Sequence, residues 1–234
     1  MKRLIKVDEA KVVSQDHTEF VEHPLEHYQQ RFNWDCGVSC VLMLLPTAQR
    51  EELLHNFEGI CAEEGFGHST WTIDLCFLLK RFGVEHRMYS TLLGVNDEYR
   101  QQGYYEKIIP MDKERIVRRF REAPSAGIWA EQRSLGDDEL AAHVRRRGPA
   151  VVLVDAGLLV CDLCRHNMLK AERWFGGSYR GHYVVLVGWS GGRALYRDPA
   201  LSPRVCGASV ARLSAARRAT GTDEDAILVY NQYR

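Results

Sequence analysis

The chain has 234 residues, and 45% of them are hydrophobic, which is enough for a sizeable core in one larger domain or two small ones. Its 31 basic residues balance its 31 acidic residues, so the composition gives no support for a protein that binds nucleic acid or anionic membranes. No apolar run approaches the roughly 20 residues needed to cross a bilayer, and the N-terminal MKRLIKVDEAK is not a secretory signal. Seven cysteines, an odd number, favour reduced thiols over a disulfide framework. We therefore expect a soluble cytoplasmic protein, with the nucleus as the alternative compartment.

The chain begins with a polar, irregular segment, residues 1–29, followed by a predicted core helix. The histidines of this segment are expected on the surface; they are His17, His23 and His27. From Cys36 to about Leu45 the sequence is apolar on most faces, which is typical of a buried helix, and Pro46 ends it.

Four more helices or strands are predicted before residue 148. The segment STWTIDLCFLLKRFGV predicts a helix with Ser69 or Thr70 as N-cap and Gly83 past its end. Residues 84–95 look extended, and residues 137–147 predict a helix capped by Asp and closed by Gly-Pro.

Residues 111–122 predict a basic amphipathic helix. The residues expected to share its buried face are Ile116, Val117 and Phe120. Its arginines are expected in solvent.

The second half of the chain is rich in predicted strands. AVVLVDAGLLV suits a buried strand, GHYVVLVGWSGGRALYRDP suits a hairpin with a glycine turn, and AILVY suits a closing strand. Helices followed by strands favour an α+β architecture. We expect a polar segment at 1–29 and one domain over 30–234, with a helical half at about 30–147 and a sheet half at about 148–234.

Cys36 is the candidate nucleophile, because it lies at the predicted start of a helix. Unpaired N–H groups and the helix dipole favour a thiolate there. In papain-like enzymes the partner histidine follows about 130–150 residues downstream, and His182 lies 146 residues after Cys36. The sequence therefore predicts a Cys–His pair.

The other two candidate catalytic residues are Asp198 and Gln30. The hairpin is expected to bring Asp198 beside the His182 ring, where its carboxylate would fix the tautomer and stabilise the imidazolium. Gln30 precedes Cys36 by six residues, and its amide could donate to an oxyanion together with the Cys36 N–H.

The motif QxxxxDCGxxC, followed by GHYVVLVG and DP, resembles the papain-like fold as used by the double-glycine leader peptidases, cysteine proteases that trim leader sequences. This resemblance implies Cys36 as nucleophile, His182 as base, Asp198 as the residue that orients the base and Gln30 as oxyanion donor. It also implies a peptide or protein substrate and no cofactor.

A longer resemblance spans nearly the whole chain. NWDCGVSC, WTIDLCFLLKRFGVEHR, STLLGV, VLVDAGLLVCDLC, GHYVVLVGW and GTDEDAILVY resemble the guanylyl cyclase domain-containing family of plants, animals and protists. That family is expected to share the papain-like fold, and its name implies conversion of GTP to cyclic GMP with Mg²⁺ or Mn²⁺. The likeness is weakest over residues 165–180.

The cyclase activity has little support from the residues themselves. There is no G-x-x-x-x-G-K loop, and the best acidic candidate, GTDED at 221–225, suits a polar turn before the last strand better than a metal site. Three hypotheses stay open: a thiol hydrolase acting on a peptide, isopeptide or related acyl bond, a guanylyl cyclase, and an inactive papain-like binding module. Nothing in the sequence indicates the oligomeric state.

Four other cysteines and two residues next to Cys36 carry secondary signals. Cys161 and Cys164 form a C-x-x-C that could hold half of a zinc site with His166 nearby, although ordinary loop cysteines are the simpler reading and no metal is predicted. A further ligand would have to be Cys206. The remaining expectations are that Cys40 is a core residue, that Trp34 either lines the cleft or anchors packing, and that Asp35 caps the helix.

Overall fold

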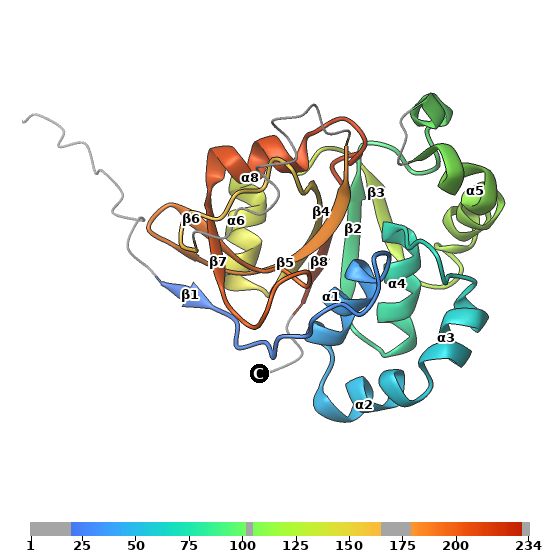
Figure 1. Ribbon diagram of the computed structural model, residues 1–234, viewed down its shortest axis with the longest axis horizontal. Coiled ribbons are helices and arrows are strands. Elements are labelled where there is room, and N and C mark those ends of the chain that lie inside the picture. The colour runs from blue at the N-terminus through green and yellow to red at the C-terminus, as the bar shows by residue number, and fades with distance from the viewer. Residues whose placement is uncertain (1–19, 102–104, 165–178, 231–234) are drawn as a thin grey trace, which may run out of the picture.

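The computed structural model describes residues 20–101, 105–164 and 179–230 (Figure 1). Within these ranges the α+β class predicted from the sequence is confirmed, because helices pack on a single large, mostly antiparallel sheet. None of the described helices has the length and apolar character needed to span a bilayer.

The sheet has the strand order β3-β2-β8-β4-β5-β6-β7, and β1 pairs with β5 off this path. The strands are β1 (Val21–Glu22), β2 (His86–Ser90), β3 (Trp129–Gln132), β4 (Ala150–Asp155), β5 (Gly181–Ser190), β6 (Arg193–Arg197), β7 (Cys206–Ser209) and β8 (Ala226–Val229). Strand β8 lies between β2 and β4 and is antiparallel to both. The predicted hairpin is β5–β6, whose turn contains two glycines at positive φ, Gly191 and Gly192.

Two hydrophobic cores lie on opposite faces of the sheet, because side chains alternate along each strand. Tyr183 and Val185 of β5 belong to one core, and Val184 and Leu186 belong to the other. Both faces of β4 and β5 are therefore covered, which explains their continuous apolar sequences.

The helices divide between these two faces. They are α1 (Cys36–Leu44), α2 (Thr47–His55), α3 (Phe57–Glu64), α4 (Thr72–Arg81), the 3₁₀ helix η1 (Asp97–Gln101), α5 (Tyr105–Glu122), α6 (Asp137–Arg146) and α8 (Val210–Arg217). Residues of α1 and α4 belong to the first core, and residues of α6 and α8 belong to the second. In Figure 1, α2 to α5 gather on one side of the view and α6 and α8 on the other.

Several boundaries differ from those predicted. Strand β4 ends at Asp155, and residues 156–158 turn away. The cap of α4 is Trp71, not Ser69 or Thr70, and its N–H donates to the Asp74 side chain at 3.0 Å. The N-cap position of α6 is Gly136. The division into a helical half and a sheet half near residue 147 is not strict. Strands β2 and β3 lie before it and helix α8 lies after it.

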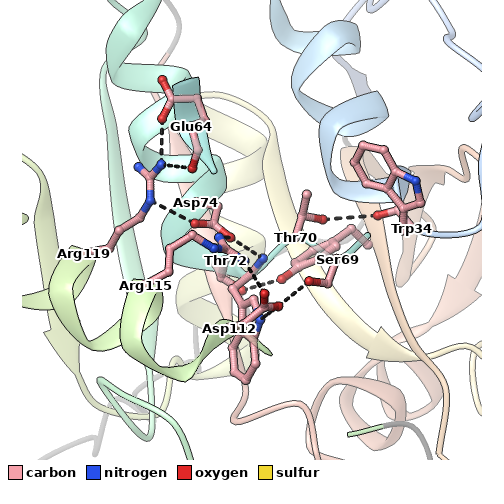
Figure 2. Close-up of polar contacts among 11 residues, drawn as sticks. Trp34, Glu64, Ser69, Thr70, Thr72, Asp74, Asp112, Arg115 and Arg119 are labelled. Carbon is pink, nitrogen blue, oxygen red and sulfur yellow. Dashed lines mark hydrogen bonds and ion pairs between the residues drawn. The ribbon is translucent and has the colours of Figure 1, made fainter. Parts of the chain in front are cut away.

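The expectation that the arginines of α5 lie in solvent is wrong for Arg115 and Arg119. Both are buried, and both pair with Asp74 of α4, which is 0% exposed (Figure 2). Arg119 also reaches Glu64 of α3 at 2.8 Å. Val117, expected on the buried face, is 49% exposed. These charged groups therefore hold α3, α4 and α5 together. The sequence pattern alone had placed the two arginines on the solvent side of α5.

The histidines after residue 19 are not simple surface residues. His23 is half-buried, and its Nε2 lies 2.7 Å from the Val144 carbonyl oxygen. The Nε2 of His27, also half-buried, lies 2.9 Å from the Leu201 carbonyl oxygen. These bonds fix the segment that contains β1 against the second half of the chain. His17 lies outside the described residues.

Helix α1 lies very close to β5 and α4, and this is possible because its second residue is Gly37. A Cβ at this position would be 2.8 Å from Leu75 Cδ1 and 3.0 Å from Tyr183 Cδ2. Gly59 in α3 offers a contrast, because a Cβ there would meet no atom within 4 Å.

We expect Gly37→Ala to lower the free energy of unfolding by about 1–3 kcal/mol, the usual cost of overpacking a dense core. The matched control Gly59→Ala should leave stability unchanged or raise it by up to about 1 kcal/mol, because alanine favours helix. Urea denaturation of both variants measures this. Equal midpoints for the two variants would contradict the proposed close packing of α1.

Candidate active site

Cys36 is the first residue of α1, and it is 8% exposed. The first N–H groups of a helix have no partner within the helix, so they point toward a group at this end. Asp35 occupies the N-cap position, but its side chain does not cap the helix. Instead it accepts hydrogen bonds from the N–H groups of Arg31 and Phe32, at 3.1 and 3.0 Å. The expected capping role is therefore wrong: Asp35 shapes the loop before Cys36 and leaves the helix end free.

His182 and Asp198 lie in direct contact. His182 is the second residue of β5, and Asp198 directly follows β6, so the hairpin brings them to the same end of the sheet. The His182 Nε2 lies 2.7 Å from the Asp198 Oδ1. Because a carboxylate accepts a proton from Nε2, the neutral ring carries its free lone pair on Nδ1.

The electrostatics of the pair favour the charged ring. Burial by itself lowers the pKa of His182, but the charge and hydrogen bond of Asp198 and a hydrogen bond with the Cys36 side chain outweigh it, and the pKa rises to about 10. Burial by itself raises the pKa of Asp198, yet the His182 ring holds it below its usual value. The three side chains predicted to be catalytic are thus in contact in the order Cys36–His182–Asp198.

Gln30, the predicted oxyanion donor, makes hydrogen bonds through both its backbone and its side chain. Its backbone N–H donates to the Pro199 carbonyl at 2.9 Å, which ties it to the residue after Asp198. Its side-chain amide donates to the Phe32 carbonyl at 2.7 Å, and its Oε1 is buried without a hydrogen-bond partner. An amide nitrogen carries two hydrogens, so the bond to Phe32 leaves one for a further acceptor.

A groove of about 790 Å³ runs beside the loop that precedes Cys36. Its walls include Phe32, Trp34, Phe57 and Arg31. The Trp34 ring stacks on Phe32 with centroids 5.7 Å apart and lies 6.3 Å from the Phe57 ring. Both alternatives for Trp34 therefore hold, since it packs between aromatic rings and also lines a groove.

A second, smaller pocket, at the end of β5 that begins with Gly181, was not anticipated. Its lining includes Gly181, Tyr183 and Asp225. The Tyr183 hydroxyl lies 2.8 Å from the Thr72 Oγ1, and Thr72 also donates to Asp225. Burial raises the pKa of Asp225 to about 7. The GTDED segment forms the expected turn before β8, but only the position of β8 in the centre of the sheet reveals that Asp225 is half-buried.

The other cysteines fall into two groups. Cys40 and Cys76 are completely buried, and burial raises their pKa values; it raises the pKa of Cys61 to about 11. These three are core thiols, as expected for Cys40. The second group is Cys161, Cys164 and Cys206, whose sulfur atoms all lie within 4.8 Å of one another. His166, suggested as their neighbour, lies outside the described residues, as does most of the segment 165–180.

The His182–Asp198 pair predicts a specific dependence of stability on pH. The folded-state pKa of His182 is about 10, against about 6.5 in an unfolded chain. The stabilisation is therefore complete below pH 6.5 and is lost as the pH rises toward 10. We expect the free energy of unfolding to fall across this window more steeply in the wild type than in Asp198→Asn.

Urea denaturation of both proteins at intervals across the window measures the difference, because all other titrating groups are shared. Parallel curves would contradict the assigned contact. At the acidic end, the lowered pKa of Asp198 predicts that the wild type also loses stability as the pH falls below about 4.

Comparisons with known proteins identify the fold and the family of this chain. The chain is 33% identical over 207 residues to "Guanylyl cyclase 1" of Arabidopsis thaliana, which covers 87% of this chain and 74% of the relative. The structure of this chain superimposes on that of a protein from Bacillus anthracis described as a C39-like peptidase. The TM-score is 0.51 at 15% identity, over 93% of this chain and 100% of the other. This likeness shows the fold, which is papain-like as predicted. The family described as Guanylylate cyclase matches residues 25–229, and the chain therefore belongs to that family.

Proposed function

We propose that this protein is a thiol hydrolase that cleaves a peptide, isopeptide or related acyl bond. The observation that carries the proposal is the contact of His182 with two partners: its Nε2 bonds to Asp198 at 2.7 Å, and its side chain bonds to Cys36 at the first residue of α1. This is the arrangement of nucleophile, base and orienting group that a covalent acyl transfer needs.

The reaction follows from this geometry. His182 takes the proton from the Cys36 sulfur, and the thiolate attacks the carbonyl carbon of the substrate. The negative charge on the carbonyl oxygen is stabilised by the Cys36 N–H and by the hydrogen of the Gln30 amide that Phe32 does not use. The imidazolium then gives its proton to the leaving amine as the C–N bond breaks. Water attacks the thioester, His182 accepts a water proton and returns it to the sulfur, and the carboxylic acid leaves.

The substrate of the proposed reaction is an extended peptide that lies in the groove beside the loop before Cys36. The groove joins an aromatic wall, formed by Phe32, Trp34 and Phe57, to the positive charge of Arg31. Aromatic walls bind apolar side chains. The proposed partner is therefore a peptide or protein, with no cofactor needed for the chemistry.

Reactivity toward iodoacetamide tests the nucleophile against a well-matched control. Cys36 and Cys61 are equally buried, at 8% and 7% exposure, but only Cys36 has a histidine beside it. At pH 7 we expect Cys36 to be alkylated faster than Cys61, and His182→Ala to remove the difference. Mass spectrometry of the alkylated peptides measures both rates. Equal rates in the wild-type protein would remove the proposal.

Hydrolysis of a proteome-derived peptide library and of isopeptide-linked protein conjugates tests the reaction itself. Cys36→Ala is expected to lose about 10³-fold or more of the turnover, Asp198→Asn up to about 10⁴-fold, and Gln30→Ala about 10²- to 10³-fold, mainly in kcat. Cys76→Ala, which removes a completely buried thiol that lines neither pocket, should keep the wild-type rate. The outcome that would contradict the proposal combines both experiments: the wild type cleaves no substrate, and iodoacetamide alkylates Cys36 no faster than Cys61. An inactive binding module would then describe the protein better.

Guanylyl cyclase activity is the second candidate, because the Arabidopsis relative carries that name and two carboxylates, Asp223 and Asp225, line the small pocket beside Tyr183. Their surroundings argue against a metal-binding role. Asp223 accepts a hydrogen bond from the Tyr99 hydroxyl at 2.8 Å, and Asp225 accepts one from Thr72. Burial also raises the pKa of both carboxyl groups, which disfavours the charged form that would bind Mg²⁺ or Mn²⁺.

We expect no cyclic GMP above a heat-inactivated control when the purified protein is incubated with GTP and Mg²⁺ or Mn²⁺. Mass spectrometric detection of cyclic GMP measures this. Cyclic GMP made by the wild type and by Cys36→Ser, but not by Asp223→Asn, would overturn the hydrolase proposal in favour of a cyclase.

A further inference from the structure

Three cysteines that are not among the proposed catalytic residues come together at the β7 edge of the sheet. Cys161 and Cys164 lie in the turn that follows β4, and Cys206 is the first residue of the edge strand β7. Their sulfur atoms lie within 4.8 Å of one another, and those of Cys164 and Cys206 are 3.7 Å apart. Within the described ranges, this is the one cluster of at least three cysteine, histidine or acidic side chains close enough to share an ion.

The sulfur spacing fits a metal ion better than a disulfide. Zinc binds thiolates at about 2.3 Å in a tetrahedron, which places two sulfurs about 3.8 Å apart. The 3.7 Å between Cys164 and Cys206 matches that edge. A disulfide would instead bring the sulfurs to about 2.05 Å.

The backbone around Cys161 is arranged to hold negative charge on its sulfur. Three N–H groups point at this sulfur, from Leu163 at 3.3 Å, Cys164 at 3.2 Å and Gly207 at 3.4 Å. A neutral thiol is a weak acceptor and does not need three donors, whereas a thiolate bound to a cation does. The donors come from both the turn and β7, so all three can stabilise negative charge on the sulfur only when the turn lies against β7.

The turn is also fixed to β7 by other contacts. The Asp162 N–H donates to the Gly207 carbonyl at 2.7 Å, and the Ser209 N–H donates to the Asp162 carboxylate at 2.9 Å. Arg212 of α8 pairs with the same carboxylate. A Cβ at Gly207 would lie 2.8 Å from Leu163 Cδ1, which shows how closely the turn approaches the strand. The three sulfurs are therefore preorganised on a rigid framework.

We propose that Cys161, Cys164 and Cys206 bind a structural Zn²⁺ ion through three thiolates, leaving the fourth coordination position for a non-cysteine ligand. Soft thiolate ligands select zinc over Mg²⁺, Ca²⁺ or Mn²⁺. On binding, the three thiols release their protons to solvent as the Zn–S bonds form. The ion joins the turn to β7, which pairs with β6, the strand that ends directly before Asp198.

The metal content of the full-length protein tests the proposal. After any affinity tag is removed and the protein is kept reduced, elemental analysis should find about one zinc per chain. Co²⁺ added to the metal-free protein should produce the near-ultraviolet sulfur-to-cobalt charge-transfer band and the intense visible bands of a tetrahedral thiolate site. Cys164→Ala should weaken Co²⁺ binding by about 100-fold or more, since even a residue that only supports a ligand contributes about 10- to 100-fold.

Two controls keep the outcome specific. Cys61→Ala removes a thiol of a distant helix and should keep the wild-type zinc content. Cys36→Ala should also keep it, so the result does not depend on whether the hydrolase proposal holds. Cys164 is half-exposed, so its variant should fold, and circular dichroism checks this. Absence of the cobalt bands in the wild type, unchanged zinc content in Cys164→Ala, or a Cys164–Cys206 disulfide in protein purified without oxygen would each overturn the proposal.

Discussion

The close contact of α1 with β5, made at Gly37, is the constraint on which the candidate site depends. Helix α1 supplies Cys36 and strand β5 supplies His182, and these two residues come from opposite ends of the chain. With any side chain at position 37, Leu75 or Tyr183 would have to move. The glycine thus sets the separation between helix and strand, and that separation decides whether the sulfur and the imidazole can share a proton.

The buried ion cluster around Asp74 has a different role, because it fixes the helices that lie beyond α1. Asp74 of α4 holds Arg115 and Arg119 of α5, and Arg119 also holds Glu64 of α3. Loss of one partner from such a buried group costs about 3–5 kcal/mol, since the remaining charge has no other partner. The same region contacts the loop before Cys36 through Thr70, whose hydroxyl donates to the Trp34 carbonyl at 3.4 Å (Figure 2). The cluster therefore supports the wall of the groove as well as the helices.

The sequence predicted the elements whose evidence is local. The apolar run after Cys36, the glycine turn at residues 191–192 and the continuous apolar run after His182 specify α1, β5 and β6 without knowledge of their neighbours. The proximity of His182 to Asp198 followed from the hairpin alone. In each case the residues that form the predictive pattern lie in the predicted element itself or in the element next to it in sequence.

Features that depend on distant partners escaped prediction. Arginines on an amphipathic helix normally face solvent, and nothing near Arg115 or Arg119 indicates that an aspartate 41 or more residues earlier is buried beneath them. Pro110 lies inside α5 and concealed its start at Tyr105. The sequence named Cys206 as the further ligand for the C-x-x-C of Cys161 and Cys164, but it could not place Cys206 on an edge strand beside them.

The position of β8 has a consequence for how the protein matures. Residues 226–229 form an interior strand with neighbours on both sides, yet a ribosome makes them after every other strand of the sheet. Until they emerge, β2 and β4 face a gap, and the long-range pairing that closes it is a slow event. A nascent chain that already contains Cys36 and His182 therefore still lacks the strand that completes the sheet, and these two residues reach their final register only after β8 has emerged.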